Sequence, residues 1–218
     1  MSISSDEARV LDVCLVHSVG PGYFGETAID KRPVGGPVAV TELGLVGDRQ
    51  LGRSHGGLDK AVYCYAAEDA RWWSDKIDRP CPPGMFGENL RTQALDVSRA
   101  LLGERWRIGE VLLEVRMPRT PCENLSLRIG IKGFHMQFNA SGRVGALLRV
   151  LERGVVQAGD RIVVESRPDH EVTVAAWATG VEAPQMRHLL DSGLPLACGV
   201  RAKARRVVDR ESNRGKMS

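Results

Sequence analysis

The sequence predicts a β-rich α+β fold with a barrel-like body, a few flanking helices and a small helical appendage at the C-terminus. Short runs rich in valine, leucine and isoleucine recur along most of the chain, and glycine, proline or aspartate separates them. Long helical patterns do not alternate regularly with these runs, which disfavours a doubly wound parallel sheet. After residue 168 the pattern changes to short helical segments.

The predicted strands begin with residues 9–17, where apolar and polar residues alternate. The other segments of this kind are short and are bounded by residues that favour turns. They cover residues 36–40, 60–66, 104–108, 111–117, 143–152 and 161–166.

Helical periodicity predicts a helix over residues 66–77, which holds Trp72 and Trp73 on a polar background, and a weaker one over residues 125–139. The segments VTVAAWATG, APQMRHLLDSG and PLACGVRAKARR predict three further short helices separated by glycine and proline. We therefore expect a body over residues 1–168 and a three-helix appendage with a basic tail over residues 169–218. The appendage is too short to bury a core of its own, so we expect it to pack on the body or on a partner.

The composition is that of an ordinary globular protein, with 218 residues, 43% hydrophobic and 26% charged. Asp6 and Glu7 stand where a signal peptide carries positive charge, and no run approaches the roughly 20 apolar residues that a membrane span needs. The cysteines are scattered and form no CxxC pair. They are Cys14, Cys64, Cys81, Cys122 and Cys198. We expect a cytoplasmic protein with free thiols and no membrane association.

Basic residues gather at the C-terminal end, although the formal net charge is only +3. They are Arg201, Lys203, Arg205, Arg206, Arg210, Arg214 and Lys216. Neither aromatic residues nor a nucleic-acid-binding motif accompanies them, so we interpret this segment as a solvated tail and predict no nucleic-acid partner.

The segment GPGYFG, residues 20–25, matches the G-x-G-x-x-G pattern of dinucleotide-binding turns and follows a predicted strand. That motif also needs a helix that begins at its last glycine and binds the pyrophosphate with its amides. Here Asp30, Pro33, Gly35 and Pro37 follow within a dozen residues and disfavour a helix. We therefore reject a Rossmann fold.

Four clusters of glycine and polar residues lie at the ends of predicted strands. They are GLVGDRQ (44–50), HGGLDKAVY (55–63), FGENL (86–90) and MPRTPC (117–122). Loops at strand ends are where a rigid scaffold brings polar groups together, and paired glycines allow a backbone to approach a ligand closely. One such cluster alone is explained by a tight turn, whereas four in one chain predict a binding site.

Cys122 is the residue in these clusters with the most reactive chemistry. The positive charge of Arg119 stabilises a thiolate, and the helix expected after Cys122 adds the positive end of its dipole. These features indicate a thiolate ligand or nucleophile, whereas Cys14 and Cys64 lie within strand-like runs and are expected in the core. A thiol hydrolase would also need a base, and His55 is the histidine that lies in a site-like loop.

In this order the clusters resemble the MOSC family, the domain first defined at the C-terminus of molybdenum-cofactor sulfurases, and within it the stand-alone bacterial members of the YiiM type. The resemblance covers about residues 29–165 and includes GERWRIGE and SGRVGALLRVL besides the four clusters. The tail is similar to the three-helix appendage that often follows this domain. The family's leucine and tryptophan ending is replaced here by PLACGVRAKARR.

The resemblance implies a β-barrel-like fold and one cysteine, Cys122 in this chain, that ligates molybdenum in a pterin dithiolene cofactor. A single soft thiolate suffices when the pterin supplies two sulfurs. The cofactor also carries a phosphate, and the basic candidates for binding it are Lys31, Lys60, Arg119 and Arg143. The candidates for contacting the pterin or orienting the basic groups are His55, Asp59, Glu88 and Asn89. For Asp59 and Glu88, ion pairing or turn capping is an equally good interpretation.

YiiM-type members are associated with the reductive removal of hydroxyl from N-hydroxylated compounds, including purine bases. The resemblance thus implies a molybdenum-dependent oxidoreductase with a small N-hydroxylated substrate and a role in detoxification. Electrons would come from an external donor protein, because the sequence has no flavin fingerprint and no cysteine cluster for an iron–sulfur centre. The pyridoxal-phosphate domain of full-length sulfurases does not fit beside the body in 218 residues. A non-catalytic carrier of molybdenum cofactor, or of sulfur on Cys122, remains an alternative, and a Cys122–His55 hydrolase is a third.

Overall fold

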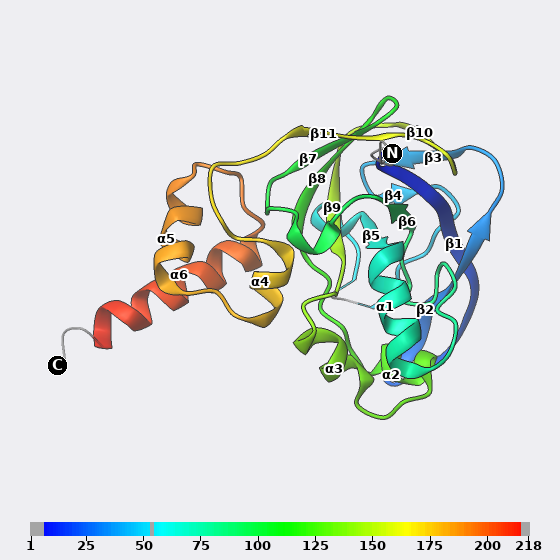
Figure 1. Ribbon diagram of the computed structural model, residues 1–218, viewed down its shortest axis with the longest axis horizontal. Helices are drawn as coiled ribbons and strands as arrows, with labels where there is room; N and C mark the ends of the chain where they lie inside the picture. Colours follow the sequence, from blue (N-terminus) through cyan, green and yellow to red (C-terminus); the bar gives the residue numbers. More distant parts are fainter. Residues whose placement is uncertain (1–6, 53–54, 215–218) are drawn as a thin grey trace, which may run out of the picture.

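The computed structural model describes residues 7–52 and 55–214, without the side chain of residue 214. Asp6 and Lys216 lie outside the described residues. The strands form one body, with two short helices below it and a group of three helices beside it (Figure 1).

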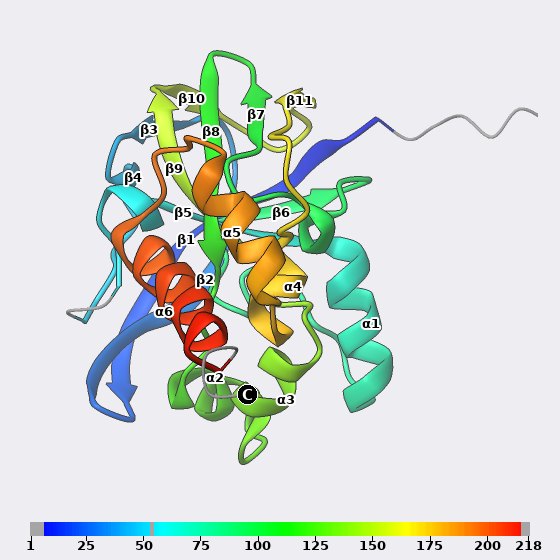
Figure 2. The same cartoon turned by 90° about the vertical axis from the view of Figure 1, so that its left-hand side faces the viewer.

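The body is built on an eight-stranded sheet (Figures 1 and 2). In spatial order its strands are β11 (Ile162–Ser166), β7 (Arg105–Ile108), β8 (Val111–Pro118), β9 (Ala146–Glu152), β5 (Val62–Ala66), β6 (Leu90–Gln93), β1 (Arg9–Gly22) and β2 (Gly25–Val34). β5 and β6 pair in parallel, and the other neighbours pair antiparallel. A smaller sheet contains β10 (Gly154–Val156), β3 (Val38–Thr41) and β4 (Gly44–Leu45).

The large sheet is open in the described part of the chain. The fold is therefore mixed α/β on an open sheet, whereas the sequence analysis predicted a barrel-like body. β1 meets the start of β11 at an isolated bridge between Arg9 and Arg161, and the amide of Ile162 donates to the Ala8 carbonyl at 2.7 Å. The amide of Val10 donates to the Asp160 carbonyl at 2.9 Å beside this bridge. These contacts do not form a named strand pairing, whereas a closed barrel needs a continuous ladder that joins the two ends of the sheet.

An aromatic cluster holds the first helix against the sheet. In α1 (Ala67–Ile77), Trp73 is buried and stacks on Phe138 of α3 (Phe134–Ala140), with 5.5 Å between the ring centroids. Phe138 also stacks on Tyr65 of β5 at 5.7 Å. Such pairs stabilise by their buried area and by the geometry of their rings. The helix predicted over residues 66–77 is confirmed.

The helix predicted over residues 125–139 is instead two helices, α2 (Glu123–Ile129) and α3. Gly130 and Gly133 lie between them, each with a φ of 72°. This left-handed conformation ends a helix and favours glycine, because glycine has no Cβ.

The strands β2, β4, β6 and β10 were not predicted. β2 carries the polar run from Asp30 to Arg32, which hides its alternation. The GPGYFG segment forms the tip of the β1–β2 hairpin, where Gly22 pairs with Gly25. No helix begins there, so the structure agrees with the rejection of a dinucleotide-binding turn.

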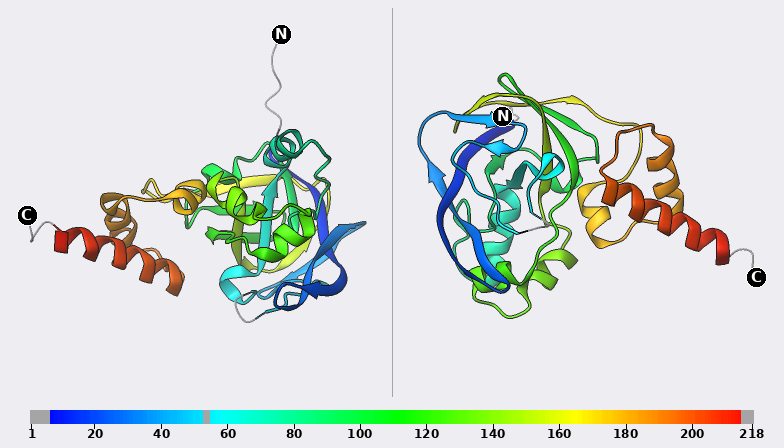
Figure 3. Two further views of the ribbon diagram at one scale, coloured as in Figure 1. Left: turned by 90° about the horizontal axis from the view of Figure 1, so that it is seen from below. Right: turned by 180° about the vertical axis from the view of Figure 1, so that it is seen from behind.

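The three helices predicted in the tail are present as α4 (Val174–Thr179), α5 (Ala183–Asp191) and α6 (Cys198–Arg214). They lie on one side of the body, and α6 extends away from it (Figures 2 and 3). Trp177 and Met186 are buried in the same hydrophobic cluster as the strands, so the helices pack on the body. The division into two domains at residue 168 stays a prediction. No described helix has the length and apolarity to cross a membrane.

Candidate functional site

A cavity of about 360 Å³ lies beside the loop between β8 and α2. Cys122 is part of this loop and lines the cavity. Each of the four sequence clusters contributes to its walls. Gln50 comes from the first cluster, His55 from the second, Gly87 from the third and Arg119 from the fourth. The fold thus brings together the loops that the sequence pointed to separately.

The Cys122 thiol is half-buried and shares a hydrogen bond with the His55 imidazole. This bond is the largest influence that lowers the pKa of Cys122 below its ordinary value. The backbone N–H of Asn124 and the charge of Arg119 act in the same direction, whereas burial opposes them. The same bond raises the pKa of His55. The pair therefore favours a thiolate beside an imidazolium.

The His55 ring is held by a second contact, because its Nδ1 lies 2.5 Å from the Leu51 carbonyl oxygen. A carbonyl oxygen can only accept, so Nδ1 carries a proton when this bond forms. The other ring nitrogen, Nε2, is thereby left to interact with the thiol of Cys122.

The charge of the cavity wall is of one sign. Five basic side chains line it, and none of its described lining residues is an aspartate or a glutamate. The basic residues are Lys31, Arg49, His55, Lys60 and Arg119. A concave site with this charge attracts an anion.

Arg119 lies above two aromatic rings, with its guanidinium carbon 5.7 Å from the centre of Tyr63 and 5.9 Å from that of Phe138. One guanidinium nitrogen, Nη1, is buried and has no hydrogen-bond partner within the described part of the chain. An unsatisfied buried donor costs about 1–3 kcal/mol, and more when it is charged. An anionic group in the cavity would supply the missing acceptor.

Lys31 reaches the cavity from β2, and its Nζ lies 2.6 Å from Oδ2 of Asp48. Burial lowers the pKa of Lys31, and the carboxylate of Asp48 opposes this shift. Asn89 also lines the cavity and donates to the same carboxylate oxygen at 2.8 Å, while its own oxygen accepts from the amide of Tyr63 at 3.1 Å. Asp48 therefore orients two of the predicted residues, Lys31 and Asn89.

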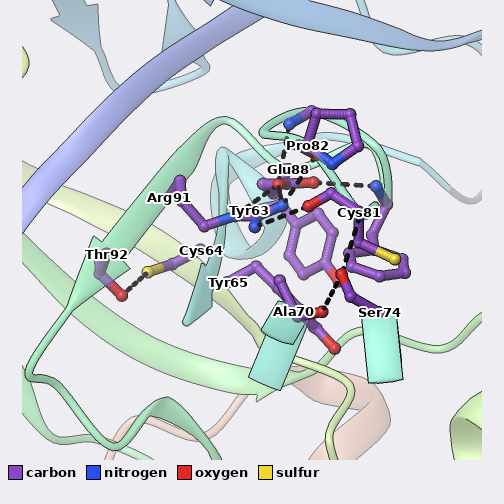
Figure 4. Close-up of polar contacts among 12 residues, drawn as sticks. Tyr63, Cys64, Tyr65, Ala70, Ser74, Cys81, Pro82, Glu88, Arg91 and Thr92 are labelled. Carbon is purple, nitrogen blue, oxygen red and sulfur yellow. Dashed lines mark hydrogen bonds and ion pairs between the residues drawn. The ribbon is translucent and has the colours of Figure 1, made fainter. Parts of the chain in front are cut away.

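Glu88 does not line the cavity. Its buried carboxylate accepts from the amides of Gly84 at 2.9 Å and Phe86 at 3.0 Å, and from Nε of Arg91 at 2.9 Å. Figure 4 shows this carboxylate among its partners. Glu88 thus holds the turn that precedes Asn89, which matches the turn-capping interpretation.

Asp59 and Arg143 also lie outside the lining residues. Asp59, in the short 3₁₀ helix Leu58–Lys60, accepts from Nε of Arg116 at 2.8 Å. Arg116 donates in addition to the Pro195 carbonyl in the loop between α5 and α6, at 2.5 Å. Arg143 pairs with Asp69. The structure therefore places both predicted residues in ion pairs outside the lining of the cavity.

Sequence reasoning did not single out Arg49, Asp48 or Asn124. Arg49 and Asn124 line the cavity, and Asp48 supports Lys31. Asp48 and Arg49 lie within the GLVGDRQ cluster, so a signal for them was present. Asn124 follows the cysteine by two residues and carried no separate signal.

The fold and the site define a protein with one activated thiol in a basic cavity beside an open, bent sheet. The model of the MOSC domain matches residues 52–163. The chain belongs to the MOSC domain family.

Named relatives support this assignment. The chain is 35% identical to the uncharacterized protein YflK of Bacillus subtilis (strain 168) over 150 residues, which are 68% of each chain. It is 33% identical to Protein YiiM of Escherichia coli (strain K12) over 174 residues, covering 76% of this chain and 78% of that protein. A protein of Gibberella moniliformis (strain M3125 / FGSC 7600) named Reductase is 33% identical over 148 residues, which cover 65% of this chain and 26% of the relative.

Solved structures show the same fold. YiiM from Geobacillus stearothermophilus has a TM-score of 0.76 at 24% identity, covering 92% of this chain and 99% of that one. YiiM from Escherichia coli has a TM-score of 0.70 at 27% identity, covering 94% of this chain and 92% of that one. The chain is a YiiM-like homologue.

Proposed function

We propose that this chain binds a molybdenum cofactor in the cavity through Cys122 and reduces N-hydroxylated small molecules to amines. The observation that carries the proposal is the activated thiol in a cavity whose charged lining is basic, where a buried nitrogen of Arg119 has no hydrogen-bond partner among the residues that the structure describes. A thiolate is a soft ligand that suits molybdenum bound by sulfur, and the cations suit a phosphate. Membership of the MOSC family and a relative named Reductase support the proposal.

When bound, the cofactor supplies a metal that passes two electrons to the substrate, so that R–NHOH, two electrons and two protons become R–NH2 and water. The side chains of this protein would bind the cofactor and orient it. Cys122 provides the sulfur ligand, and His55 stabilises its thiolate by donating from the ring. Arg119 donates from Nη1 to the anionic end of the cofactor, and Lys60 lies on the same wall.

Two electrons must reach the site from outside, and we propose an external electron-donor protein as their source. The hairpin at residues 20–25 opens no helix that would hold a dinucleotide. We therefore expect protein produced with molybdate to contain molybdenum by elemental analysis. It should convert an N-hydroxylated base with an artificial electron donor and should not do so with NADH alone.

The outcomes separate this function from its alternative. Protein that retains molybdenum, yet reduces none of several N–OH substrates with a strong artificial donor, is a cofactor carrier rather than a reductase. Protein that takes up no molybdenum under the same conditions contradicts both the reductase and the molybdenum-cofactor carrier, and leaves the carrier of sulfur on Cys122.

A further inference from the structure

The first turns of α6 carry a cluster of cations. Residues 198–208 contain Arg201, Lys203, Arg205 and Arg206 and no acidic residue. Within the described part of the chain, none of these three arginines forms an ion pair with a carboxylate. Arg201 and Arg205 are one turn apart on the helix, so their charges repel each other. An acidic partner would offset this repulsion.

The exposed arginines of α6 lie away from the face by which the helix packs on the protein. Val200 and Ala204, one turn apart, are buried in the hydrophobic core cluster. The Nζ of Lys203 lies 4.5 Å from the centre of the Trp177 ring and donates to the Trp177 carbonyl at 3.1 Å. Arg205 and Arg206 are exposed, so a partner can reach them without displacing the helix.

The start of α6 is connected to the wall of the cavity. Arg116 donates to the Pro195 carbonyl, three residues before α6, and its Nε donates to Asp59 at 2.8 Å. Asp59 precedes Lys60, which lines the cavity. In both views of Figure 3 the start of α6 lies on the side of the body that carries the short helix Leu58–Lys60.

Two further arginines extend the cationic surface to the cavity. Nη1 of Arg149 lies 3.7 Å from Oδ1 of Asp59, and Arg149 follows Leu147, which lines the cavity, by two residues on β9. Arg49 is exposed and lines the cavity itself. We call these residues the basic band: Arg49, Arg149, Arg201, Arg205 and Arg206. Because Arg49 belongs to both, a partner that covers the band reaches the rim of the cavity.

We propose that the basic band is the docking surface for the electron donor, and that this donor is a protein with an acidic face. The inference rests on the proposed function and adds the place and the chemistry of the partner to it. The donor carries one electron at a time, in a flavin or an iron–sulfur centre. One turnover then converts R–NHOH, two protons and two reduced donors into R–NH2, water and two oxidised donors.

Charge decides the kind of partner. Arginines on one surface attract an acidic surface and raise the rate of encounter, and salt weakens the complex. A one-electron donor must leave between transfers, which suits a small and polar interface. Nucleic acid is also an anion, but single strands bind by stacking on aromatic rings as well as by charge. The exposed aromatic residues of the described chain lie elsewhere, on the β1–β2 hairpin and on α1.

The test uses the full-length, molybdenum-loaded protein with an N-hydroxylated purine base and two donors in turn, reduced flavodoxin as the acidic protein and a small artificial donor. Arg205→Glu combined with Arg206→Glu should lower kcat/KM for flavodoxin at least roughly tenfold at low salt, because complementary charge speeds encounter by about 10- to 1,000-fold. Turnover with the artificial donor and molybdenum content should stay unchanged, because neither residue lines the cavity.

The matched control combines Arg71→Glu with Lys76→Glu, which reverses two exposed cations on α1 and should behave as the wild type with both donors. Calorimetry with oxidised flavodoxin measures docking without turnover. The wild type should bind, less tightly as salt rises, and the α6 variant should show no measurable binding at the same concentrations.

The outcomes separate this inference from the proposed function. If the wild type reduces the base with the artificial donor but does not bind flavodoxin, or if both double variants accept its electrons at equal rates, the basic band is wrong and the proposed function stands. Tighter binding of a DNA duplex than of flavodoxin, lost in the α6 variant, also overturns the inference. If the wild type is inactive with the artificial donor, the proposed function fails, and the calorimetry alone decides whether the band binds an acidic protein.

Discussion

The thiol of Cys122 and the imidazole of His55 share one hydrogen bond that moves both pKa values. It lowers the pKa of the thiol and raises that of the imidazole, so the two shifts stabilise the same charged pair. Both shifts favour a proton on the ring over a proton on the sulfur, relative to the two groups taken separately. The cavity thus holds a thiolate at a pH where an ordinary cysteine is protonated.

Alkylation by iodoacetamide should show this thiolate in the protein without cofactor. The second accessible thiol is Cys198, so the measurement is made in a Cys198→Ser background. Because its pKa is lowered, Cys122 should reach half its maximal alkylation rate below pH 9.0, the ordinary value. In the same background His55→Asn should move the curve to higher pH and slow alkylation at pH 7. Superimposable curves would contradict the role of the hydrogen bond.

Molybdenum content should depend on Cys122 and not on Cys198. Cys122→Ser replaces a soft thiolate by a hydroxyl, which is a poor ligand for the metal, so retained molybdenum should fall to background. Cys198→Ser should retain the wild-type amount, because Cys198 is exposed at the start of α6. The two variants are compared by elemental analysis and thermal unfolding. A wild-type amount of molybdenum in Cys122→Ser would contradict the assignment of Cys122 as the metal ligand.

Arg119→Ala and Arg143→Ala should have opposite effects. Removing Arg119 takes away a charge-assisted contact of about 1.5–3 kcal/mol, so cofactor affinity should fall roughly 10- to 150-fold. Stability without cofactor should fall less than for Arg143→Ala, because the guanidinium packs on the rings of Tyr63 and Phe138 but its buried Nη1 has no hydrogen-bond partner among the described residues. Removing Arg143 leaves the buried carboxylate of Asp69 without its ion-pair partner and should lower stability while cofactor is retained. Bound molybdenum and urea unfolding are measured for both variants. If Arg119→Ala lowered only stability and Arg143→Ala lowered only bound cofactor, Arg143 would be the cofactor-binding residue and Arg119 the structural one.

Arg116→Ala should be among the most destabilising substitutions of a charged residue. The substitution removes the ion pair between Arg116 and Asp59. It also removes one of the two arginines that pair with the buried carboxylate of Glu114, so that only the pair with Arg105 is kept among the described residues. Breaking a buried ion pair costs about 3–5 kcal/mol. The matched control is Arg153→Ala, whose ion pair with Glu42 is exposed and should contribute little. Equal midpoints of urea unfolding for the two variants would show that the Arg116 cluster is not stabilising.

The sequence predicts strands well where alternation and turn residues coincide, as in residues 111–117, which lie within β8. It failed for β2, because Lys31 on that strand faces the cavity and its partner Asp48 is 17 residues away. Polar residues that build a site interrupt the pattern by which a strand is recognised. The local sequence also could not show that Asp59 and Lys60 have different roles. The two are neighbours, yet Lys60 lines the cavity and Asp59 pairs with Arg116.

Arg116 joins parts of the chain that are made at different times. Its partner Asp59 lies 57 residues earlier, and its partner Pro195 lies 79 residues later. During synthesis Asp59 and Arg116 can pair well before the loop that contains Pro195 leaves the ribosome. The Nη2 donor of Arg116 therefore has no acceptor from Pro195 until that later segment has been synthesised. Arg116 also contacts Asp59 in the short helix that carries Lys60. We expect a nascent chain that stops before residue 195 to expose this wall of the cavity to proteolysis, although every strand of the body has already been synthesised.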